Sequence, residues 1–592
     1  MPALDDVKVT KVDTFADAER CIQWLTDLGN GVLAIDTESH GLRPSEHPIR
    51  LGQLGDDQQA WVFECEGNRS WAGFFVKLLE KFTGTLVGHN LKFDERVIRK
   101  WLGIQLPLER CHDTMLMSRV VEPTRSAALK RLSSQLVDPR AAVLQSQLDD
   151  AMKTSGFNWS TVPLSFAQYW MYAGIDCILT RQVYDILHPR VMAEAPRAYE
   201  LELAVSSVCG KMEDHGIRVD TSRAEQKHDE LLKYVDELAT YCQTYYSVHP
   251  GKNKDVIEYL TNRGITFTTL TKGGSIALDA EVLDGIDHPL ANLVLQRRKA
   301  QKIASTYLRH FYQDVDEDDR LHPSVNFVAA ETGRMSMSSP NMQNLPRTDT
   351  NELAQLVRSC VIPAPDHTLV FADFSQIEFR LFASLSENQD LIHAFDADDF
   401  FTEMARGIFN DPNIQKKDPR RQITKNAMYA TIYGAGDKKF AWTAGISLSE
   451  AKEFMALLNL RFPAIKQLQR RITGEGERNL RETGTASVMG PLFGRRFSID
   501  DDKIYKLVNF MVQGSAAQVL KLKLIQLAQA GLQEYLVIPV HDEVILEVPD
   551  GILHDVVHTV SGIMNDSTMF AVPLESEITV GNSWGAKRAY AR

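Results

Sequence analysis

The chain has 592 residues, of which 24% are charged and 44% hydrophobic, and its formal net charge is −13. This length exceeds what one hydrophobic core supports, so we expect about two to four domains. The sequence has no run of about 18 apolar residues and starts with a polar, acidic stretch, so we expect neither a membrane-spanning helix nor a signal peptide. Its seven cysteines form no C-x-x-C pair, so we expect free thiols, no zinc site and a cytoplasmic location.

The first third of the chain alternates strand-like and helix-like segments. GVLAI (31–35), QAWVFEC (59–65) and GTLVGHN (84–90) read as strands, and LKFDERVIRKWLG (91–103) reads as a helix that Gly103 closes. This alternation predicts an α/β unit.

Four carboxylates follow these predicted elements. Asp36 and Glu38 end the first strand and, being two apart, point to the same side of it. Asp94 lies at the start of the helix, and Tyr172 and Asp176 are four apart on one face of a later helix. Four carboxylates gather in one site only with cations, and their hard oxygens suit Mg²⁺ or Mn²⁺. The sequence therefore predicts two ions that stabilise the attacking and departing oxygens of a phosphoryl displacement.

Residues 31–180 resemble a DEDD-family 3′–5′ exonuclease of the Y subtype. The ordered motifs DTE, N-x-x-F-D and Y-x-x-x-D match at Asp36, Glu38, Asn90, Phe93, Asp94, Tyr172 and Asp176. The resemblance implies an RNase H-like fold, metal ligands at the four carboxylates and an attacking water that Tyr172 helps to orient. No metal-ligand position is substituted, so we expect an active nuclease.

Helical periodicity dominates from about residue 197 to 311, and a mixed α/β pattern follows. TLVFADFSQIEFRLFASL (368–385) reads as a strand that stops at Asp373 and turns into a helix carrying Glu378. EYLVIPVHDEVILEV (534–548) reads as a β-hairpin with His541 and Asp542 at its tip, and Pro539 predicts a sheet edge or a kink in its first arm. Two strand-end aspartates with a basic helix between them are the parts of a phosphoryl-transfer site.

That helix, RRQITKNAMYATIYG (420–434), carries a stripe of four side chains, Arg421, Lys425, Tyr429 and Tyr433. Residues four apart drift by only about 40° around a helix, so the stripe has charge at one end and rings at the other. A bound deoxynucleoside triphosphate has the same order of phosphates, sugar and base. The alternative is an ordinary amphipathic helix with a solvated end and a buried end.

From about residue 200 onward the chain resembles a family A DNA polymerase. DFSQIEFR (373–380) resembles the family's D-Y-S-Q-I-E-L-R, the stripe matches R-x-x-x-K-x-x-x-(F/Y)-x-x-x-Y-G, and VHDEV (540–544) matches V-H-D-E. TGRMS with NMQNLPR (332–347), KIASTY (302–307) and VNFMVQGSAAQVLK (508–521) also resemble family segments.

The resemblance implies roles for individual residues. Two Mg²⁺ ions, or Mn²⁺, would be held by Asp373, Asp542 and the backbone carbonyl of Phe374. The deoxynucleoside triphosphate would be bound by Arg421, Lys425, Tyr429, Tyr433, Glu378 and Gln376, with Glu378 crowding the ribose 2′ position. Primer and template would be contacted by Arg334, Gln343, Asn344, Asn509, Gln513, His541 and Lys302, the last within a carboxylate-free basic run, 296–310.

Several positions depart from the family pattern without touching a metal ligand. Tyr429-Ala430 replaces a common Phe-Gly, Gln518 replaces an acid, Tyr505 replaces an arginine that contacts the template, and Phe401 replaces a histidine. In the family, tyrosine at position 429 accompanies poor discrimination against dideoxynucleotides, so we expect this chain to accept chain terminators.

The fold class we predict is multidomain α/β: an RNase H-like 3′–5′ exonuclease domain (1–192) followed by a right-hand polymerase domain (193–592). We place the thumb at about 200–320, the fingers at about 388–490, and the palm at about 321–387 and 491–592. Only about 30 residues precede GVLAIDTE, so we expect no 5′-nuclease domain ahead of it. We expect a monomer with primer–template DNA and deoxynucleoside triphosphates as partners, in the host cytoplasm if a phage encodes it, and leave a processivity partner open.

Two other interpretations remain at this point. One is a free-standing exonuclease of RNase D type, which leaves about 400 residues without a role. The other is a catalytically inactive nucleic-acid-binding scaffold, which the loss of Asp373 or Asp542 would favour, and both are present.

Overall fold

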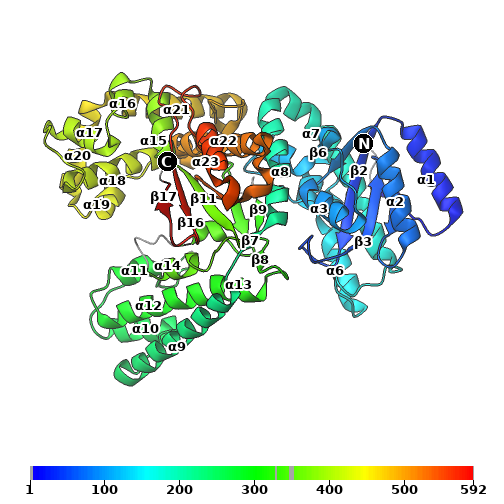
Figure 1. The fold of residues 1–592 in the computed structure, drawn as a ribbon, viewed down its shortest axis with the longest axis horizontal. Helices are drawn as coiled ribbons and strands as arrows, with labels where there is room; N and C mark the ends of the chain where they lie inside the picture. Colours follow the sequence, from blue (N-terminus) through cyan, green and yellow to red (C-terminus); the bar gives the residue numbers. More distant parts are fainter. Residues whose placement is uncertain (1–3, 272, 327–329, 346–351, 591–592) are drawn as a thin grey trace.

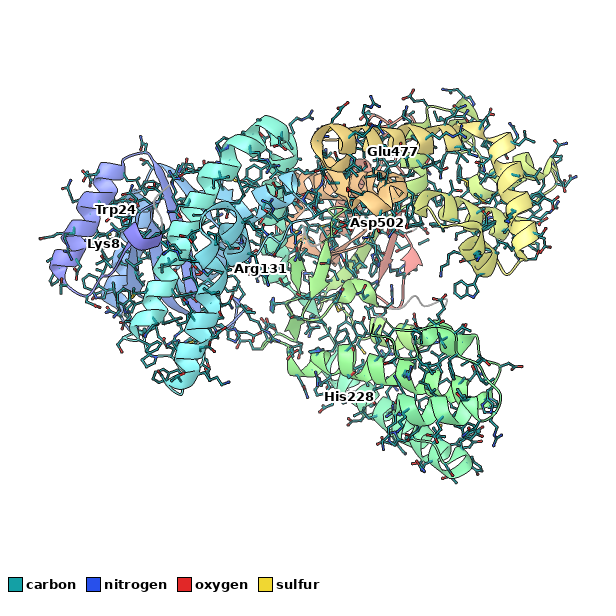
Figure 2. All side chains as sticks on the ribbon, turned by 180° about the vertical axis from the view of Figure 1, so that it is seen from behind. Lys8, Trp24, Arg131, His228, Glu477 and Asp502 are labelled. Carbon is teal, nitrogen blue, oxygen red and sulfur yellow. The ribbon has the colours of Figure 1, made fainter. Side chains whose placement is uncertain are left out.

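The computed structural model describes residues 4–271, 273–326, 330–345 and 352–590. An α/β unit at the N-terminus lies on one side of a central antiparallel sheet, one helical lobe lies on the opposite side, and another lies below (Figure 1). Figure 2 shows the same parts from behind, with Trp24 in the N-terminal unit, His228 in the lower lobe and Glu477 in the upper one. Pro346 and Arg347 of the motif NMQNLPR lie outside the described residues.

The N-terminal unit is built on a six-stranded mixed sheet with strand order β1-β4-β3-β2-β5-β6. Its strands are β1 (Lys8–Lys11), β2 (Val32–Ser39), β3 (Ile49–Gly55), β4 (Gln59–Glu64), β5 (Thr85–Gly88) and β6 (Cys111–Asp113). Its helices are α1 (Phe15–Leu28), α2 (Arg69–Lys81), α3 (Leu91–Leu102), α4 (Thr114–Val121), α5 (Leu129–Leu136), α6 (Leu144–Thr154) and α7 (Ala167–Glu194). The predicted α/β unit, its three strands and the helix that Gly103 ends are confirmed.

Strand β3 escapes prediction because polar residues interrupt its apolar pattern. Arg50 and Gln53 are both buried in it. The guanidinium of Arg50 donates to Glu66 at 2.8 Å and to the carbonyls of Trp159 at 2.9 Å and Val162 at 2.6 Å. A buried arginine is tolerated when its donors are satisfied in this way.

The central sheet has strand order β14-β15-β11-β16-β17, and all its pairs are antiparallel. Its strands are β11 (His367–Phe374), β14 (Leu536–Val540), β15 (Glu543–Pro549), β16 (Ser576–Gly581) and β17 (Arg588–Ala589). The predicted hairpin is confirmed, and β14, which contains Pro539, is an edge strand as predicted. Helices α8 (Pro196–His215), α15 (Ile377–Ser386), α22 (Leu507–Leu527) and α23 (Leu553–Met564) pack around this sheet.

The lower lobe has its own apolar core, in which buried side chains from several of its helices pack together. It consists of α9 (Thr221–Tyr246), α10 (Asn253–Thr261), α11 (Ala280–Asp284), α12 (Pro289–Ile303) and α13 (His310–Gln313), with α14 (Glu352–Arg358) beside α12. Helix α8 is not part of this lobe, because it packs on α22 and on β14 of the central sheet. The predicted thumb range of about 200–320 therefore includes one helix that belongs to the central part.

The upper lobe is formed by α16 (Gln389–His393), α17 (Phe400–Phe409), α18 (Pro419–Tyr433), α19 (Asp437–Ala444), α20 (Leu448–Arg461) and α21 (Pro463–Thr483). Three two-stranded antiparallel sheets account for the other strands of the described residues: β7 (Ile217–Arg218) with β8 (Arg320–Leu321), β9 (Ser324–Asn326) with β10 (Ser336–Ser338), and β12 (Ala486–Met489) with β13 (Arg496–Ile499). Among the described residues, no helix is both long and apolar enough to cross a bilayer.

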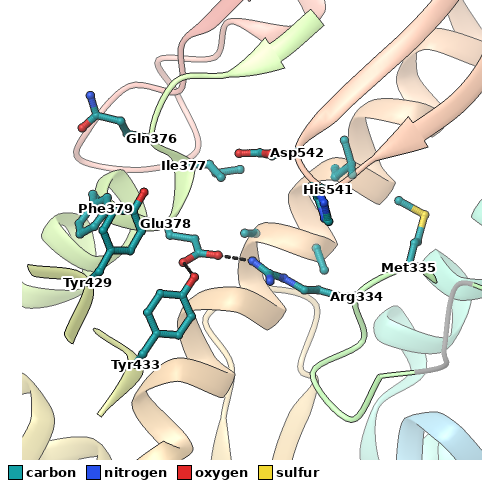
Figure 3. A pocket seen from close by; sticks show the side chains of 13 residues that line it. Arg334, Met335, Gln376, Ile377, Glu378, Phe379, Tyr429, Tyr433, His541 and Asp542 are labelled. Atoms are coloured by element: carbon teal, nitrogen blue, oxygen red, sulfur yellow. Dashed lines mark hydrogen bonds and ion pairs between the residues drawn. The ribbon is translucent and has the colours of Figure 1, made fainter. Parts of the chain in front are cut away.

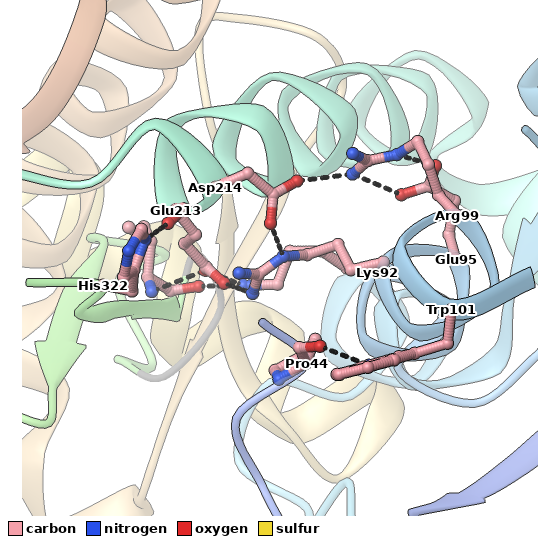
Figure 4. Close-up of polar contacts among 10 residues, drawn as sticks. Pro44, Lys92, Glu95, Arg99, Trp101, Glu213, Asp214 and His322 are labelled. Carbon is pink, nitrogen blue, oxygen red and sulfur yellow. Dashed lines mark hydrogen bonds and ion pairs between the residues drawn. The ribbon is translucent and has the colours of Figure 1, made fainter. Parts of the chain in front are cut away.

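A charge network fastens the N-terminal unit to the central part through α3 and α8 (Figure 4). The buried carboxylate of Glu213 pairs with Lys92 and Arg96 and accepts the backbone N–H of Val325 at 2.7 Å. The neighbouring Asp214 accepts from Arg96 Nε at 2.7 Å. Helix α3, which carries Asp94, is therefore held by ion pairs along one side.

Candidate active sites

The first site lies where β2 and α7 meet in the N-terminal unit. Asp36 and Glu38 of β2 and Asp176 of α7 each offer a carboxylate oxygen, and these oxygens lie within 4.8 Å of one another. Strand alternation brings the first two together, and the long helix α7 supplies the third, as the sequence predicts.

Asp94 lies beside this cluster but is not part of it. Its buried carboxylate accepts the backbone N–H of Thr37 at 3.0 Å and the hydroxyl of Thr37 at 2.7 Å. Desolvation, followed by the charge of Asp36, raises the pKa of Asp94 well above its usual value. The fourth predicted carboxylate thus faces Thr37 next to the other three.

Sequence reasoning missed a lysine inside the same site. Lys130 of α5 forms an ion pair with Asp176, and its ammonium lies 4.1 Å from the ring centroid of Tyr172. Desolvation raises the pKa of Asp36 to about 7 and that of Glu38 to about 8, and the charge of Lys130 opposes both shifts. Desolvation also lowers the pKa of Lys130, to about 7, which the charges of Asp36 and Glu38 oppose. Nothing in the run LKRL distinguishes this lysine from one on a solvated helix face.

A second residue missed from sequence is Asp113, which fixes the start of α3. Its buried carboxylate accepts the backbone N–H groups of Asn90 at 3.1 Å and Leu91 at 2.8 Å, and it caps α4 through Met115 at 2.8 Å. Asn90 has a left-handed backbone with φ of 64°, a conformation that asparagine adopts more readily than most residues. Asp113 therefore anchors the turn that leads to Asp94.

The second site lies at the end of β11 in the central sheet. The backbone N–H of Phe374 donates to the carbonyl of Asp542 at 3.2 Å, which places the hairpin tip beside the end of the strand carrying Asp373. Desolvation, followed by the charge of Asp542, raises the pKa of Asp373 to about 7. The two aspartates, far apart in sequence, are brought together as predicted.

Two carboxylates beside Asp373 were not predicted as part of this site. Glu543 of β15 and Glu577 of β16 are its register partners across the sheet, so the three side chains share a face. Glu543 is buried and forms an ion pair with Lys587, whose ammonium lies 4.2 Å from the ring centroid of Phe371. Lys587 thus supplies a positive charge next to the aspartate pair.

A cavity of about 260 Å³, lined by Asp542 but not by Asp373, opens at the hairpin tip (Figure 3). The side chain of Glu378 is fixed inside this cavity by two partners. One carboxylate oxygen pairs with Arg334, and the other accepts the hydroxyl of Tyr433 at 2.9 Å. The lining joins α15, α18, α22, the hairpin tip and the segment before β10, through Arg334, Met335, Gln376, Ile377, Glu378, Phe379, Tyr429, Tyr433, Ala516, Ala517, Leu520, His541 and Asp542.

Helix α18 presents the tyrosine end of the predicted stripe to this cavity, through Tyr429 and Tyr433, whereas Arg421 and Lys425 do not line it. Asp418 caps its first turn at Arg420, and Gly434 ends it with a left-handed backbone. The rings of Tyr429 and Tyr433 stack with centroids 6.0 Å apart, and Tyr429 meets Phe379 edge-on at 4.7 Å.

The charged end of the stripe is held by α17. Asp399 accepts from Arg421 Nε at 2.6 Å and Nη2 at 2.7 Å, while it also caps α17 through Thr402. The ring of Phe401 lies 5.7 Å from the Arg421 guanidinium and 5.8 Å from the Lys425 ammonium. Sequence reasoning did not single out Asp399.

The residues predicted to contact primer and template are distributed around the cavity. Arg334 and His541 line it, and Gln343 is buried beneath it with its amide donating to the carbonyl of Pro539 at 3.1 Å. Asn509 and Gln513 lie on α22. Asn344 and Lys302 are exposed and do not line the cavity.

Both sites have the donor chemistry of divalent-cation sites. Carboxylate oxygens are hard ligands, and the raised pKa values of Asp36, Glu38 and Asp373 reflect negative charge that the protein desolvates. In the described part of the chain, the buried Oε1 of Gln376 and Oδ1 of Asn509 have no hydrogen-bond partner. Unpaired buried oxygens of this kind are costly unless a ligand or water satisfies them.

Two family models match the chain. The model of DNA polymerase family A matches residues 221–586, and a model of a 3′–5′ exonuclease matches residues 9–192. The DNA polymerase of Mycobacterium phage L5 is 27% identical over 605 residues, which cover 98% of this chain and 97% of that relative. The DNA polymerase of Mycobacterium phage D29 is 27% identical over 540 residues, 87% of each chain.

A thermostable DNA polymerase I of Thermus filiformis is 32% identical over 433 residues, covering 69% of this chain and 50% of that relative. Among solved structures, the POL domain of Pol1 from M. smegmatis, in complex with a DNA primer–template and dNTP, aligns with a TM-score of 0.77. The alignment covers 95% of this chain and 98% of that one at 23% identity, so the likeness establishes the fold.

Proposed function

This chain belongs to DNA polymerase family A and carries a 3′–5′ exonuclease domain, and from this premise we propose that it replicates DNA with proofreading at two separate metal sites. Synthesis takes place at the central sheet and removal of the primer 3′ nucleotide at the N-terminal sheet. The observation that carries the proposal is that one cavity joins Asp542, Glu378 and the tyrosine end of the α18 stripe.

In this proposal the α18 stripe binds the incoming nucleotide, with its tyrosine end in the cavity and its charged end beyond the cavity lining. Arg421 and Lys425 bind the phosphates of the incoming nucleotide, Tyr429 faces its sugar and Tyr433 its base. Glu378 is held by two partners, so its carboxylate keeps a fixed position from which it excludes a ribose 2′-hydroxyl. A group fixed before the substrate arrives discriminates best, because no ordering remains to be done on binding.

The carboxylates would hold divalent ions, Mg²⁺ by preference and Mn²⁺ as the alternative. Asp373, Asp542 and the Phe374 carbonyl would hold two ions for synthesis, and Asp36, Glu38, Asp94 and Asp176 two for degradation. When bound, such ions offset the charge that develops on the attacking and leaving oxygens. Tyr172 lies beside the carboxylates of the exonuclease site, where it orients the water that attacks the terminal phosphodiester.

Primer–template DNA would cross the central sheet between the two helical lobes. In this proposal the last base pairs are contacted by Arg334 and His541 of the cavity lining, by Asn509 and Gln513 of α22, and by Gln343, which bonds the carbonyl of Pro539. Asn344 and Lys302 would contact the backbone farther along the duplex, which the exposure of Lys302 on α12 favours. We propose a monomer that acts in the cytoplasm of a phage host, a location that two phage polymerases favour by aligning over 87% or more of both chains.

The two-site proposal is tested by primer extension and primer degradation with paired variants. We expect Asp542→Ala to abolish extension and to leave degradation of single-stranded DNA intact. We expect the double variant Asp36→Ala with Glu38→Ala to do the reverse. Loss of a metal-ligand carboxylate removes most of the stabilisation of the transition state, so each loss should exceed about a thousandfold.

Matched controls are the exposed carboxylates Asp555 of α23 and Asp27 of α1, and their replacement by alanine should leave both activities intact. If Asp542→Ala removed both activities from a folded protein, the separation of the two sites would be wrong.

A further inference from the structure

A lysine occupies the centre of the proposed exonuclease site. Lys130 is only 8% exposed, and its ammonium pairs with Asp176 and lies over the ring of Tyr172. Asp36 and Glu38 offer oxygens within 4.8 Å of that of Asp176, and both feel the charge of Lys130. One cation of the chain itself thus contacts one carboxylate of the cluster and acts electrostatically on the other two.

This placement is not the ordinary behaviour of a helix lysine. Lysine side chains usually extend their charged end into water, as the neighbouring Arg131 does on the same helix, where it is exposed (Figure 2). Burial of an ammonium is costly unless charge partners offset it. The carboxylate cluster supplies that compensation, and the ammonium in return offsets the mutual repulsion of the carboxylates.

A divalent ion and this ammonium compete for the same oxygens. Asp36, Glu38 and Asp176 would hold a divalent ion through one carboxylate oxygen each. The ammonium of Lys130 already contacts the Asp176 carboxylate, and two cations this close would repel strongly in a desolvated site. Its long aliphatic stem allows the ammonium to move aside.

We propose that Lys130 is a built-in counter-ion of the exonuclease site, which holds the carboxylates together before divalent ions load and competes with those ions for Asp176. The proposal rests on the metal site proposed above. Lys130 then sets the concentration of divalent ion at which the nuclease becomes active, and it does so without taking part in synthesis.

The test measures Mn²⁺ binding by electron paramagnetic resonance on the full chain, with Asp542→Asn in every sample to weaken the synthesis site. We expect Lys130→Met to bind Mn²⁺ at the exonuclease site at least about tenfold more tightly than the parent, because the competing charge is gone. Lys130→Arg keeps the charge and should stay close to the parent. Arg131→Met, one residue away and exposed, is the matched control and should not change binding.

Thermal unfolding in EDTA gives a second readout. Lys130→Met should lower the Tm, since the carboxylates lose their partner, and Mn²⁺ should raise the Tm of this variant more than that of the parent. Primer extension by each variant, measured with Asp542 intact, checks that the chain is folded, and Lys130→Gln replaces the methionine variant if the latter does not fold.

Mn²⁺ affinity of Lys130→Met equal to or weaker than that of Arg131→Met would overturn the competition. A different result, in which Asp36→Ala leaves Mn²⁺ binding of the parent unchanged, would overturn the metal site itself. The two failures are therefore distinguishable.

Discussion

Asp399 is the residue that orients the arginine proposed to bind the triphosphate. It accepts from two nitrogens of Arg421, Nε and Nη2, and these two bonds fix the plane of the guanidinium. Replacement by asparagine removes the charge and one of the two acceptors. We expect Asp399→Asn to raise the KM for deoxynucleoside triphosphate about tenfold with little change in kcat, equivalent to about 1.4 kcal/mol.

Steady-state single-nucleotide incorporation measures both constants. The control is Glu403→Gln on the same helix, whose carboxylate pairs with Arg406 instead. A lower KM in Asp399→Asn would mean that Asp399 competes with the phosphates and does not position Arg421.

Tyr429 provides a second prediction at the scale of one residue. Its ring is fixed by Tyr433 and Phe379 at the wall of the cavity, so its hydroxyl has a defined position near the sugar of a bound nucleotide. We expect this hydroxyl to replace a missing 3′-hydroxyl by bonding a phosphate oxygen. Tyr429→Phe should then lower the incorporation of dideoxynucleotides relative to deoxynucleotides about 10- to 100-fold, the range for a hydrogen bond to a charged group.

Competition between the two nucleotides in primer extension gives this ratio directly. Tyr245→Phe, an exposed tyrosine on α9, serves as the control. Equal use of terminators by Tyr429→Phe and the parent would rule out the hydroxyl's role.

At the scale of elements, sequence periodicity predicted those parts of the sites that depend on one strand or one helix. Alternation in β2 placed Asp36 and Glu38 together, helix spacing placed Tyr172 with Asp176, and the stripe on α18 followed from a spacing of four. The structure adds side chains that reach a site only through tertiary packing. Lys130, Asp399 and Lys587 come from segments whose local pattern is that of a solvated face or a helix cap.

Asp94 is a predicted site residue whose contacts could not be predicted from local sequence. Its position at the start of α3 was predicted, but its hydrogen bonds with Thr37 depend on how α3 lies across β2. Strand β3 was missed because Arg50 and Gln53 break its apolar run, and only distant partners satisfy the arginine. Local pattern therefore gives the elements, while packing decides which polar groups meet.

Helix α3 gives a prediction at this scale, since one side of it is fixed to α8 by Glu213. Glu213 is 2% exposed and has Lys92, Arg96 and the Val325 N–H as partners. Glu213→Ala removes the buried carboxylate that pairs with Lys92 and Arg96, although Arg96 keeps its contact with Asp214, and removing one member of a buried ion pair costs about 3–5 kcal/mol. We expect unfolding by denaturant to show a loss of that size, and exonuclease activity to fall more than synthesis because α3 carries Asp94.

Glu230→Ala is the control, because Glu230 pairs with Lys227 on the exposed surface of α9 and such pairs contribute about 1 kcal/mol or less. A change in Glu213→Ala as small as that of the control would show that the network does not stabilise the junction.

The whole molecule combines two catalytic units that share one interface. The family match over 221–586 excludes a free-standing exonuclease, because it assigns the remaining residues to a polymerase. The inactive-scaffold interpretation loses support for the same reason, and because the hairpin tip with Asp542 lies against the end of the strand that carries Asp373. The exonuclease unit meets the polymerase unit where its α3, β6 and α7 pack on α8. The packing of these elements sets the arrangement of the two units.

Histidines at that interface make its stability depend on pH. His112 of β6 bonds the hydroxyl of Tyr199 on α8 at 3.1 Å, and its ring stacks on that of Tyr199 with centroids 5.9 Å apart. His188 of α7, with Asp185 nearby, lies edge-on to His112 at 5.0 Å. Desolvation, and then the charge of His188, lowers the pKa of His112 to about 4.

A histidine whose pKa is lowered by folding stabilises the native state only while it is neutral. The unfolded chain takes up the proton near pH 6.5, whereas the folded chain resists it until about pH 4, so stability is lost as the pH falls through that window. We expect the free energy of unfolding to drop by about 1–2 kcal/mol between pH 7.5 and pH 5 through His112. In His112→Phe, which keeps a ring against Tyr199 but carries no proton, this part of the drop should vanish, whereas His558→Phe at an exposed position of α23 should keep it. Urea unfolding at both pH values measures the difference, and an unchanged drop in His112→Phe would show that protonation at this interface does not govern the acid stability of the chain.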